Sequence, residues 1–584
     1  MRLTKTFKSL FLVGLLIVSL AILTGCDDKT QLHESDLSQE GVALENYLPK
    51  DALFAITLNL NDEDQAEKLA KLGDKFPEET RKKIFEGILE ELNKELERID
   101  ATLDEDLLPI LGENPRVLLG MGSNFPDLEE NPDEMPEMYV ALTVDDPQAM
   151  IELNDKYLPI DPELSKGSEF GEVTYDFEKS AEDSMYVAHY KDTIFMSNKK
   201  NIRHEALKRI KNNEESLLNH KLYKELYEKV MKPNFATFYI NYEHYFDLIA
   251  QLEGEDYPMK FKEGFHMAIF MGLQADDDGV RMISMPAFEN APFDMADFPM
   301  HEPYLHNGTP GKNLIMYAEI YNLKKSLEIG MDFYEWDEDT SKELRKAELL
   351  VKKTIGIDWK EDILSWMDKG FAMVLQRNDS MIPAISFYVD ASSNPEGAGE
   401  VIDLLDAALE EAYNGLLASA EPGIDVATIV RKEVVQVGKS ELNKFSFDVS
   451  GMSDEELLAA GMPSGIFTEP IELYYGLTVN DYFIFSTYSG LDKDFDNFVS
   501  VGSLIEVQEG REYVKDYPYN LSYISVEEAF KYVDQIFTAM EKVEGPMDEE
   551  ALEAYGLVRD FLAPVKYMIG SDKLDQSAGF IKIE

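Results

Sequence analysis

The stretch LPKDALFAITLNL, residues 48–60, places a Pro-containing turn directly before an apolar run of strand length. A second stretch of the same kind, TPGKNLIMYAEIYNL, occupies residues 309–323. Because β-branched and aromatic residues favour strands and Pro interrupts them, each stretch predicts the first strand of a folded unit. Two units also suit a chain of 584 residues, which is longer than most single domains.

The features that follow each opening strand recur in the same order. They are a charged helix start (75–85, 334–344), a connector (103–122, 357–376), a strand leading into a helix (137–153, 384–405), a hairpin (183–198, 471–487), a strand–helix segment (233–252, 517–536) and closing strands (266–285, 565–583). Lys191-Asp192 and Asn480-Asp481 take the turn positions of the two hairpins. This repetition predicts an α+β fold of two homologous domains, each a mainly antiparallel curved sheet packed with helices.

The domain boundaries follow from the turn and linker signals. We predict a first repeat over 47–290 and a second over 309–584. The segment between them, 291–308, contains Pro292, Pro299 and Pro303 without a periodic apolar pattern. Such a composition is typical of a linker.

The first 26 residues predict where the protein is located. Arg2, Lys5 and Lys8 precede an apolar run over 10–23, which is shorter than the roughly 20 residues of a comfortable membrane span and therefore predicts a signal peptide. The run ends in LTGC, residues 23–26, which resembles the lipobox of bacterial lipoproteins. That resemblance implies removal of residues 1–25 and a lipid on Cys26. The alternative is an ordinary signal peptide or an N-terminal anchor with a chance cysteine.

A lipid on Cys26 would also explain why the chain has a single cysteine, which cannot form an internal disulfide. Residues 26–46 are polar and unpatterned, and we predict a flexible tether there. The expected location is the cell envelope, extracytoplasmic and lipid-anchored to a membrane, either periplasmic or surface-exposed. These sequence features do not choose between an inner membrane, an outer membrane and a cell surface.

The charge of the chain excludes one class of partner. Lys and Arg total 55 against 113 Asp and Glu, so the formal net charge is −58. A surface of that sign repels phosphate backbones, and we therefore expect no nucleic acid partner. A hydrophobic content of 44% is ample for packed cores and does not fit a disordered acidic protein.

The order of elements resembles a family of uncharacterised bacterial envelope proteins grouped under a domain of unknown function. The resemblance rests on the opening LPKDALFAITLNL, a helical region, and the connector DLLPILGENPRVLLGMG. It covers most of residues 45–584 and implies extracytoplasmic domains behind a signal or anchor. It implies no activity, cofactor or catalytic residue.

Two motifs come close to metal sites without matching one. HEPYLH, residues 301–306, separates its two His by five positions with Pro303 between them, so one helical face cannot present both. Asp492, Asp494 and Asp496 have the spacing of a calcium loop, but Asn497 and Ser503 stand where Gly and a bidentate Glu are required. We predict no metal site, with a loop at His301, Glu302 and His306 as the open alternative.

Other motifs have simpler structural readings. DFYEWDED (332–339) combines aromatic and acidic residues as a sugar-binding face does, yet GDKFPEET in the first half has the same character at a helix start. LGMGSN (119–124) lacks the third glycine of a dinucleotide fold. Asp278-Gly279 predicts a hairpin turn. The remaining His are scattered: His33, His189, His204, His220, His244 and His266.

These observations predict a non-enzymatic lipoprotein that binds or scaffolds something in the cell envelope. We expect no catalytic residues and no cofactor, with Cys26 as the only site residue. The expected partners are the membrane, through the lipid on Cys26, and an unknown envelope protein or small ligand. Two alternatives stay open: a peptide or small-molecule binder with its ligand between the halves, and an envelope-polymer hydrolase that uses a carboxylate pair.

Overall fold

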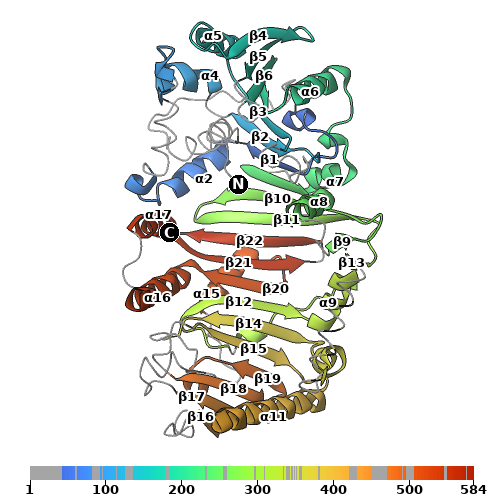
Figure 1. The fold of residues 1–584 in the computed structure, drawn as a ribbon, viewed down its shortest axis with the longest axis vertical. Helices are drawn as coiled ribbons and strands as arrows, with labels where there is room; N and C mark the ends of the chain where they lie inside the picture. Colours follow the sequence, from blue (N-terminus) through green and yellow to red (C-terminus); the bar gives the residue numbers. More distant parts are fainter. Residues whose placement is uncertain are drawn as a thin grey trace. The chain divides into compact units, whose positions relative to one another are not determined.

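Figure 1 shows the computed structural model of the chain. The structure describes residues 43–59, 62–81, 93–94, 96–112, 115–124, 136–178, 184–230, 233–253, 259–294, 297–307, 309–332, 334–336, 342, 346, 349, 352–353, 358–378, 382–419, 430–448, 470–489, 491–494, 505–544, 549–573 and 575–584. The chain divides into two compact units. Unit 1 comprises the residues up to Ala291 together with Ile583–Glu584, and unit 2 comprises Pro292–Lys582.

Unit 1 alternates strands with helices and short helical turns along the chain. In chain order its elements are η1 (Leu44–Tyr47), β1 (Phe54–Asn59), α2 (Glu63–Gly73), η2 (Leu103–Leu107), α4 (Leu108–Leu111), β2 (Arg116–Met121), β3 (Met138–Thr143), α5 (Pro147–Tyr157), β4 (Leu164–Glu169), β5 (Glu172–Glu178), β6 (Ser184–Tyr190), β7 (Thr193–Ser197), α6 (Lys200–Asn212), η3 (Leu217–Asn219), α7 (Lys221–Val230), β8 (Ala236–Asn241), α8 (Tyr242–Glu253), β9 (Met259–Phe261), β10 (His266–Asp276) and β11 (Gly279–Glu289). Its strands pair side by side in the order β4-β5-β6-β7-β3-β2-β1-β8-β10-β11.

Unit 2 also alternates strands with helices. Its elements are η5 (Leu305–Asn307), β12 (Leu314–Tyr321), α9 (Leu323–Asp332), β13 (Tyr334–Trp336), η6 (Trp359–Ile363), η7 (Leu364–Trp366), β14 (Gly370–Gln376), β15 (Ala384–Asp390), α11 (Pro395–Ser419), β16 (Val430–Val437), β17 (Ser440–Phe447), β18 (Ile471–Leu477), β19 (Tyr482–Ser486), α14 (Leu491–Asp494), α15 (Ile505–Arg511), η8 (Glu512–Val514), β20 (Tyr519–Ser525), α16 (Val526–Glu544), α17 (Glu549–Leu562), β21 (Val565–Lys573) and β22 (Gln576–Ile583). Its strands pair in the order β16-β17-β18-β19-β15-β14-β12-β20-β21.

The pairings within both sheets are antiparallel and helices are present in each unit, which confirms the predicted α+β class. Strand β12 pairs with β14 through a β-bulge between Leu314 and Met316. A bulge inserts one extra residue, so the two residues that flank it face opposite sides of the sheet.

Local sequence explains several element boundaries. Asp62 begins α2 by accepting a hydrogen bond from the Gln65 amide at 3.0 Å, and Asp146 begins α5 by accepting one from the Ala149 amide at 2.9 Å. Such side-chain caps satisfy amides that have no partner within the helix. Gly112 ends α4 with a φ of 82°, a conformation that favours glycine.

The predicted hairpin turns are present. Lys191, with a φ of 54°, lies in the turn between β6 and β7, and Asp481, with a φ of 61°, lies in the turn between β18 and β19. The turn between β10 and β11 falls one residue earlier than predicted, because Gly279 already pairs with Asp276. The tip is therefore Asp277-Asp278, inside a hairpin whose arms are those expected.

The core of unit 1 lies on one face of its sheet. Buried side chains from β1, β2, β3, β7, β8, β10 and β11 meet side chains from η1, α6 and α7, among them Tyr47, Ala206, Tyr223, Tyr239 and Phe270. Tyr223 packs edge-on against Tyr239 and Phe270, with ring centroids 4.9 and 5.5 Å away. Aromatic pairs of this geometry stabilise a core beyond their buried area.

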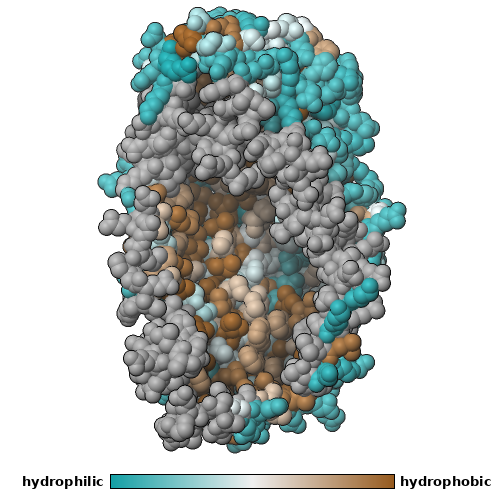
Figure 2. All heavy atoms as spheres, in the orientation of Figure 1, coloured by the Kyte–Doolittle hydropathy of each residue, from teal (hydrophilic) through white to brown (hydrophobic). Residues whose placement is uncertain are grey.

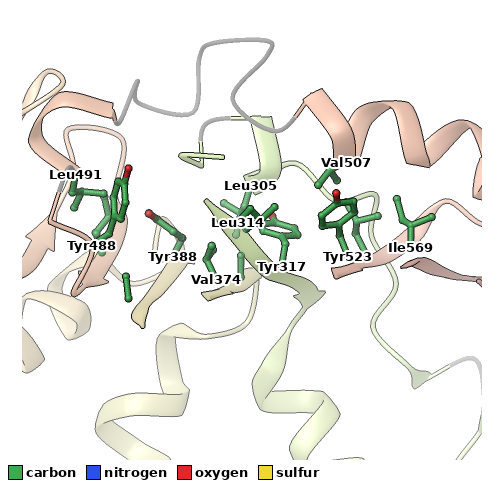
Figure 3. Packing of buried hydrophobic residues seen from close by; sticks show 14 of the residues in the cluster. Leu305, Leu314, Tyr317, Val374, Tyr388, Tyr488, Leu491, Val507, Tyr523 and Ile569 are labelled. Carbon is green, nitrogen blue, oxygen red and sulfur yellow. The ribbon is translucent and has the colours of Figure 1, made fainter. Parts of the chain in front are cut away.

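The main core of unit 2 is built in the same manner on one face of its sheet. Tyr317, Val374, Tyr388, Tyr523 and Ile569 come from five strands and pack against residues of η5, α14, α15 and η8 (Figure 3). A second cluster around Trp366, Ala398 and Phe483 joins η7 and α11 to β15 and β19.

The folded region extends into two segments assigned above to a tether and a linker. Leu44 and Glu45, within the predicted tether 26–46, are fully buried, and so is Leu305 of the predicted linker 291–308. Sequence pattern missed both because each helical turn is too short to show a 3.6-residue period.

The turn at Leu305 is held by a buried carboxylate. Glu319 on β12 is 3% exposed and accepts hydrogen bonds from the amides of Tyr304 and Leu305 at 2.6 and 2.9 Å. The Tyr317 hydroxyl donates a further bond at 2.6 Å. Burial acts to raise the pKa of Glu319, but these bonds and the neighbouring His306 outweigh it and hold the pKa below its ordinary value.

We expect Glu319→Gln to lower the free energy of unfolding of unit 2 by about 1–3 kcal/mol at pH 7, because an amide cannot accept all of these bonds. The contribution of a carboxylate with a lowered pKa is present above its unfolded pKa, about 4.3, and is lost as pH falls through the folded pKa. The gap between parent and variant should therefore narrow below about pH 4 in thermal or denaturant unfolding.

The matched control is Glu302→Gln, since the Glu302 side chain is 71% exposed and should leave stability unchanged. A gap between parent and Glu319→Gln that stays constant from pH 7 to pH 3 would contradict the role assigned to the carboxylate.

Candidate functional site

Five apolar side chains cross the unit 2 sheet on the face opposite its main core. Their residues pair strand to strand, in the order Met568, Ile524, Met316, Leu375 and Ile385. Side chains alternate between the faces of a strand. Because Ile569, Tyr523, Tyr317, Val374 and Ala384 point into the core, their five neighbours must face the other way. We call these five residues the apolar row.

The apolar row is only partly covered. Met568, Ile524 and Ile385 are 38, 36 and 40% exposed, and Met316 and Leu375 are half-buried. In Figure 2 hydrophobic atoms gather over the strands of unit 2 on the face turned to the viewer. Large apolar side chains in contact with water cost free energy, and a contiguous group of them marks a binding surface more often than a single one does.

A second row lies beside the first, two residues further along each strand. It consists of Gly570, Ser522, Ala318, Met373 and Phe387. The first three are small, and a Cβ added at Gly570 would lie 2.7 Å from the Ser522 hydroxyl. These short side chains make the surface of the sheet lower along β21, β20 and β12 than at the larger side chains of the apolar row beside them.

The other side of the apolar row is bounded by helix α16. It follows β20 without an intervening residue and packs against β12, β20 and β21. Gln535 donates a hydrogen bond to the Asn378 carbonyl at 2.9 Å, and Arg377 Nε lies 3.1 Å from Glu528 Oε2. These contacts hold the helix against the strand ends.

Unit 1 has a comparable row on the face opposite its own core. Met138, Met121, Phe54, Ile240 and Ile269 pair strand to strand in that order across β3, β2, β1, β8 and β10. All five are half-buried.

The chemistry of both rows is that of binding rather than of catalysis. None of the ten side chains can ionise, and none is a nucleophile. The backbone groups beneath them are paired in the sheet, so a ligand gains no main-chain hydrogen bonds there. Met, which occurs in both rows, is flexible and polarisable and adapts to ligands of irregular shape.

The HEPYLH motif does not form a shared site in the structure. His301 is exposed and stacks on Tyr321, with ring centroids 4.7 Å apart. His306 is 2% exposed, lies 3.5 Å from Glu319, and accepts a hydrogen bond from Arg511 at 3.3 Å. Both therefore have structural partners, and Glu302 lies 3.5 Å from Arg511 instead of beside the His pair.

Asp492 and Asp494 of the calcium-like motif lie in a short helix, α14. Asp492 lies 3.4 Å from the Tyr474 hydroxyl, while Asp496 lies outside the described residues. Within the residues that the structure describes, no three His, Cys, Asp or Glu side chains are grouped in a way that could hold a metal ion.

Other predicted positions are only partly described. Cys26 and the whole N-terminal segment through residue 42 lie outside the described residues, as do Phe333 and residues 337–339 of DFYEWDED. Tyr334–Trp336 of that motif form strand β13, where the sequence predicted the start of a helix. LGMGSN runs from the end of β2 into a loop. His189 is buried, its Nε2 lies 3.1 Å from the Asn154 amide nitrogen, and burial lowers its pKa to about 4, so it is neutral at pH 7.

The apolar rows escaped sequence analysis. Strands such as GFAMVLQ (370–376) are apolar at nearly every position, so alternation does not identify a core face. The available signal was the strand AISFYVD (384–390) together with the absence of polar alternation in an antiparallel sheet, which predicts two faces that both avoid water. Among the described helices, none has the length and apolar character that a membrane span requires.

Comparison with known proteins gives one family and one weak structural likeness. A family model described as "Protein of unknown function (DUF3352)" matches residues 8–421. A solved structure titled "Structure of crystal form I of TP0453" is 11% identical over 45% of this chain and 88% of that chain, with a TM-score of 0.23. No curated protein matches the chain.

We expect calcium to leave the melting temperature of the protein unchanged relative to magnesium at the same concentration, because Asn497 and Ser503 cannot complete the Asp492 loop. Thermal melts in chelator, magnesium and calcium measure this directly. Magnesium is the control because any divalent cation screens a chain of net charge −58. Stabilisation by micromolar calcium well beyond that by magnesium would show that the loop binds the ion.

Proposed function

The chain belongs to DUF3352, a family of proteins of unknown function, and from that membership and the apolar rows we propose that it is a non-enzymatic envelope lipoprotein that binds an apolar ligand. The observation that carries the proposal is the partly exposed apolar row of unit 2, Met568 to Ile385. Its five strands place the outer side chains about 19 Å apart, at about 4.8 Å per strand. A ligand that covers the row would be elongated and would have to lack polar groups along that length.

The free energy available from such binding is considerable. Complete burial of an Ile, Leu or Met side chain is worth about 1.5–3 kcal/mol, and the row offers the exposed remainder of five. Flexible Met residues and the small side chains of the second row allow a ligand to settle without displacing the backbone. These features support storage or transport of an apolar molecule in preference to recognition of a polar one.

Location at a membrane is the second part of the proposal. The LTGC sequence before Asp27 supports cleavage at Cys26 and attachment of a lipid to its thiol. A soluble body held near a bilayer by a lipid can exchange apolar molecules with it. The high negative charge keeps that body from adhering to anionic headgroups.

We also propose that the two units are copies of one domain, with repeats at about 47–290 and 309–584. The support is that the pairing order β4-β5-β6-β7-β3-β2-β1-β8-β10 of unit 1 recurs in unit 2 as β16-β17-β18-β19-β15-β14-β12-β20-β21. In addition, Ile240 and Ile524 each precede by two residues a helix that follows its strand directly. On this proposal the two rows are equivalent, and each chain offers two binding faces.

The hydrolase alternative has less support than binding does. A glycosidase requires two carboxyl groups that flank one bond, whereas the rows contain no carboxyl group. The peptide alternative is also weaker, because a peptide on a sheet face would leave its own backbone groups without partners.

We expect Ile385→Asp to weaken binding of hexadecanol about tenfold, because it places a charge where the ligand would exclude water. The measurement is displacement of the fluorescent apolar probe N-phenyl-1-naphthylamine from the chain comprising Asp27 to Glu584, which contains every described residue. Position 385 is partly solvated, so the Asp of the variant reaches water as the parent Ile does, and the melting temperature should change little.

The matched control is Val434→Asp. Val434 is 64% exposed on the unit 2 strand β16 and lies outside the row, so this variant should bind like the parent. Equal binding by all three proteins, or equal loss in both variants, would refute the row as the binding surface.

We expect Cys26→Ser to abolish lipid attachment, because serine offers no thiol for diacylglyceryl transfer. The variant should remain as uncut precursor or be released from the membrane, which fractionation and mass spectrometry of the N-terminus would reveal. A variant that is processed and fractionates like the parent would refute the lipobox.

A further inference from the structure

The two apolar rows differ at the edge that faces the following helix. In unit 2, two residues beyond Met568 and Leu375 on the same face of the sheet stand Lys566 and Arg377. In unit 1, the residues two positions beyond Ile269 and Met121 are Met267 and Ser123. At these matched positions among the described residues, unit 2 has two cations and unit 1 has none, in a chain that carries 113 acids and 55 basic residues.

The charge of Lys566 is available to a ligand. Glu527 and Glu528 lie in the first turn of α16, and the charge of Lys566 acts on Glu527, whose pKa is lowered by its hydrogen bond to Lys531 and, less strongly, by Lys566. Glu527 lies 2.6 Å from Lys531 Nζ, and Glu528 lies 3.1 Å from Arg377 Nε and 2.8 Å from Lys531 Nζ. Both acids thus have cationic partners, and none of the described carboxylates forms an ion pair with Lys566. The half-buried Lys566 adds a positive charge at the Met568 end of the row.

The spacing and length of the two rows in unit 2 limit the width and length of a ligand that could lie on them. Side chains of the apolar row and the second row are about 7 Å apart along the strands, which leaves room for one hydrocarbon chain over the small residues Gly570, Ser522 and Ala318. The row itself spans about 19 Å, the length scale of one extended long-chain acyl group. A diacyl lipid would need twice this width.

We propose that unit 2 holds a long-chain fatty acid, with its hydrocarbon tail along the apolar row and its carboxylate at Lys566. The proposal deepens the proposed function and rests on it. Charge complementarity selects the anionic head, because an uncharged or cationic head at this position would leave Lys566 without a partner or repel it. Unit 1 takes apolar molecules without this preference, since Met267 and Ser123 carry no positive charge.

The test compares hexadecanoate with hexadecanol, which has the same chain and no charge, on the protein from Asp27 to Glu584. Lys566→Met keeps the aliphatic part of the side chain and removes its charge. We expect it to weaken hexadecanoate binding to unit 2 about fivefold, the upper range for a partly exposed ion pair, and to leave hexadecanol binding unchanged. The readout is displacement of N-phenyl-1-naphthylamine, with affinities at low and high salt.

Lys573→Met is the matched control. Lys573 lies seven residues further along the same strand, so it faces the opposite side of the sheet, where its Nζ lies 4.9 Å from the centre of the Tyr517 ring. This variant should bind both ligands like the parent. Preference of the parent for hexadecanoate, lost in Lys566→Met and retained in Lys573→Met, supports the proposal.

Three outcomes would overturn it. Equal affinities of parent and Lys566→Met for hexadecanoate would remove the head site while leaving the apolar function intact. Failure of both ligands to bind the parent would refute the proposed function as well. Sedimentation with phosphatidylglycerol vesicles that depends on Lys566, in a protein that does not bind hexadecanoate, would assign this edge to a membrane surface instead.

Discussion

An antiparallel sheet that is apolar on both faces gains free energy when water is excluded from each of them, and this constraint governs each unit of the protein. On one face of the unit 2 sheet, Tyr317, Tyr523 and Val374 pack under η5, α14, α15 and η8. On the other, Met316, Ile524 and Leu375 have no comparable cover from the described helices, with α16 contacting the strand ends. Burial of the first face supplies the stability of the unit, and the second face supplies a surface that gains free energy when something covers it.

Buried polar groups within this apolar framework determine which segments pack together. Glu319 fixes the turn before β12, and the hydroxyls of Ser386 and Ser486 pair at 2.7 Å within the core between β15 and β19. Such buried bonds contribute modestly when satisfied and cost much more when broken, so they define which turn and which strand lie together. The specificity of the fold therefore depends on a few buried polar contacts, while its stability depends on the apolar surface area that is buried.

The sequence was sufficient for the class of fold and for the hairpin turns at Lys191 and Asp481, because these depend on local patterns. The helix start predicted at 334–344 is wrong at Tyr334–Trp336, which form strand β13. The sequence was insufficient for the buried turns at Leu44 and Leu305, whose burial arises from contacts with residues far along the chain. The apolar row escaped prediction for another reason. Row and core residues such as Leu375 and Val374 are chemically alike, and only strand pairing and helix placement distinguish the exposed face from the covered one.

The β-bulge in β12 determines which residues of that strand face the core and which face the apolar row. Leu314 points into the core and Met316 into the apolar row, although two residues that are separated by two positions ordinarily share a face. Deletion of Ile315, the extra residue, would leave Leu314 and Met316 adjacent and still on opposite faces, whereas deletion of a residue in the regular part of the strand would reverse the facing of every residue on one side of it. The bulge is therefore the position at which β12 tolerates the loss of one residue, while elsewhere in the strand a substitution disturbs the two faces less than a change of length does.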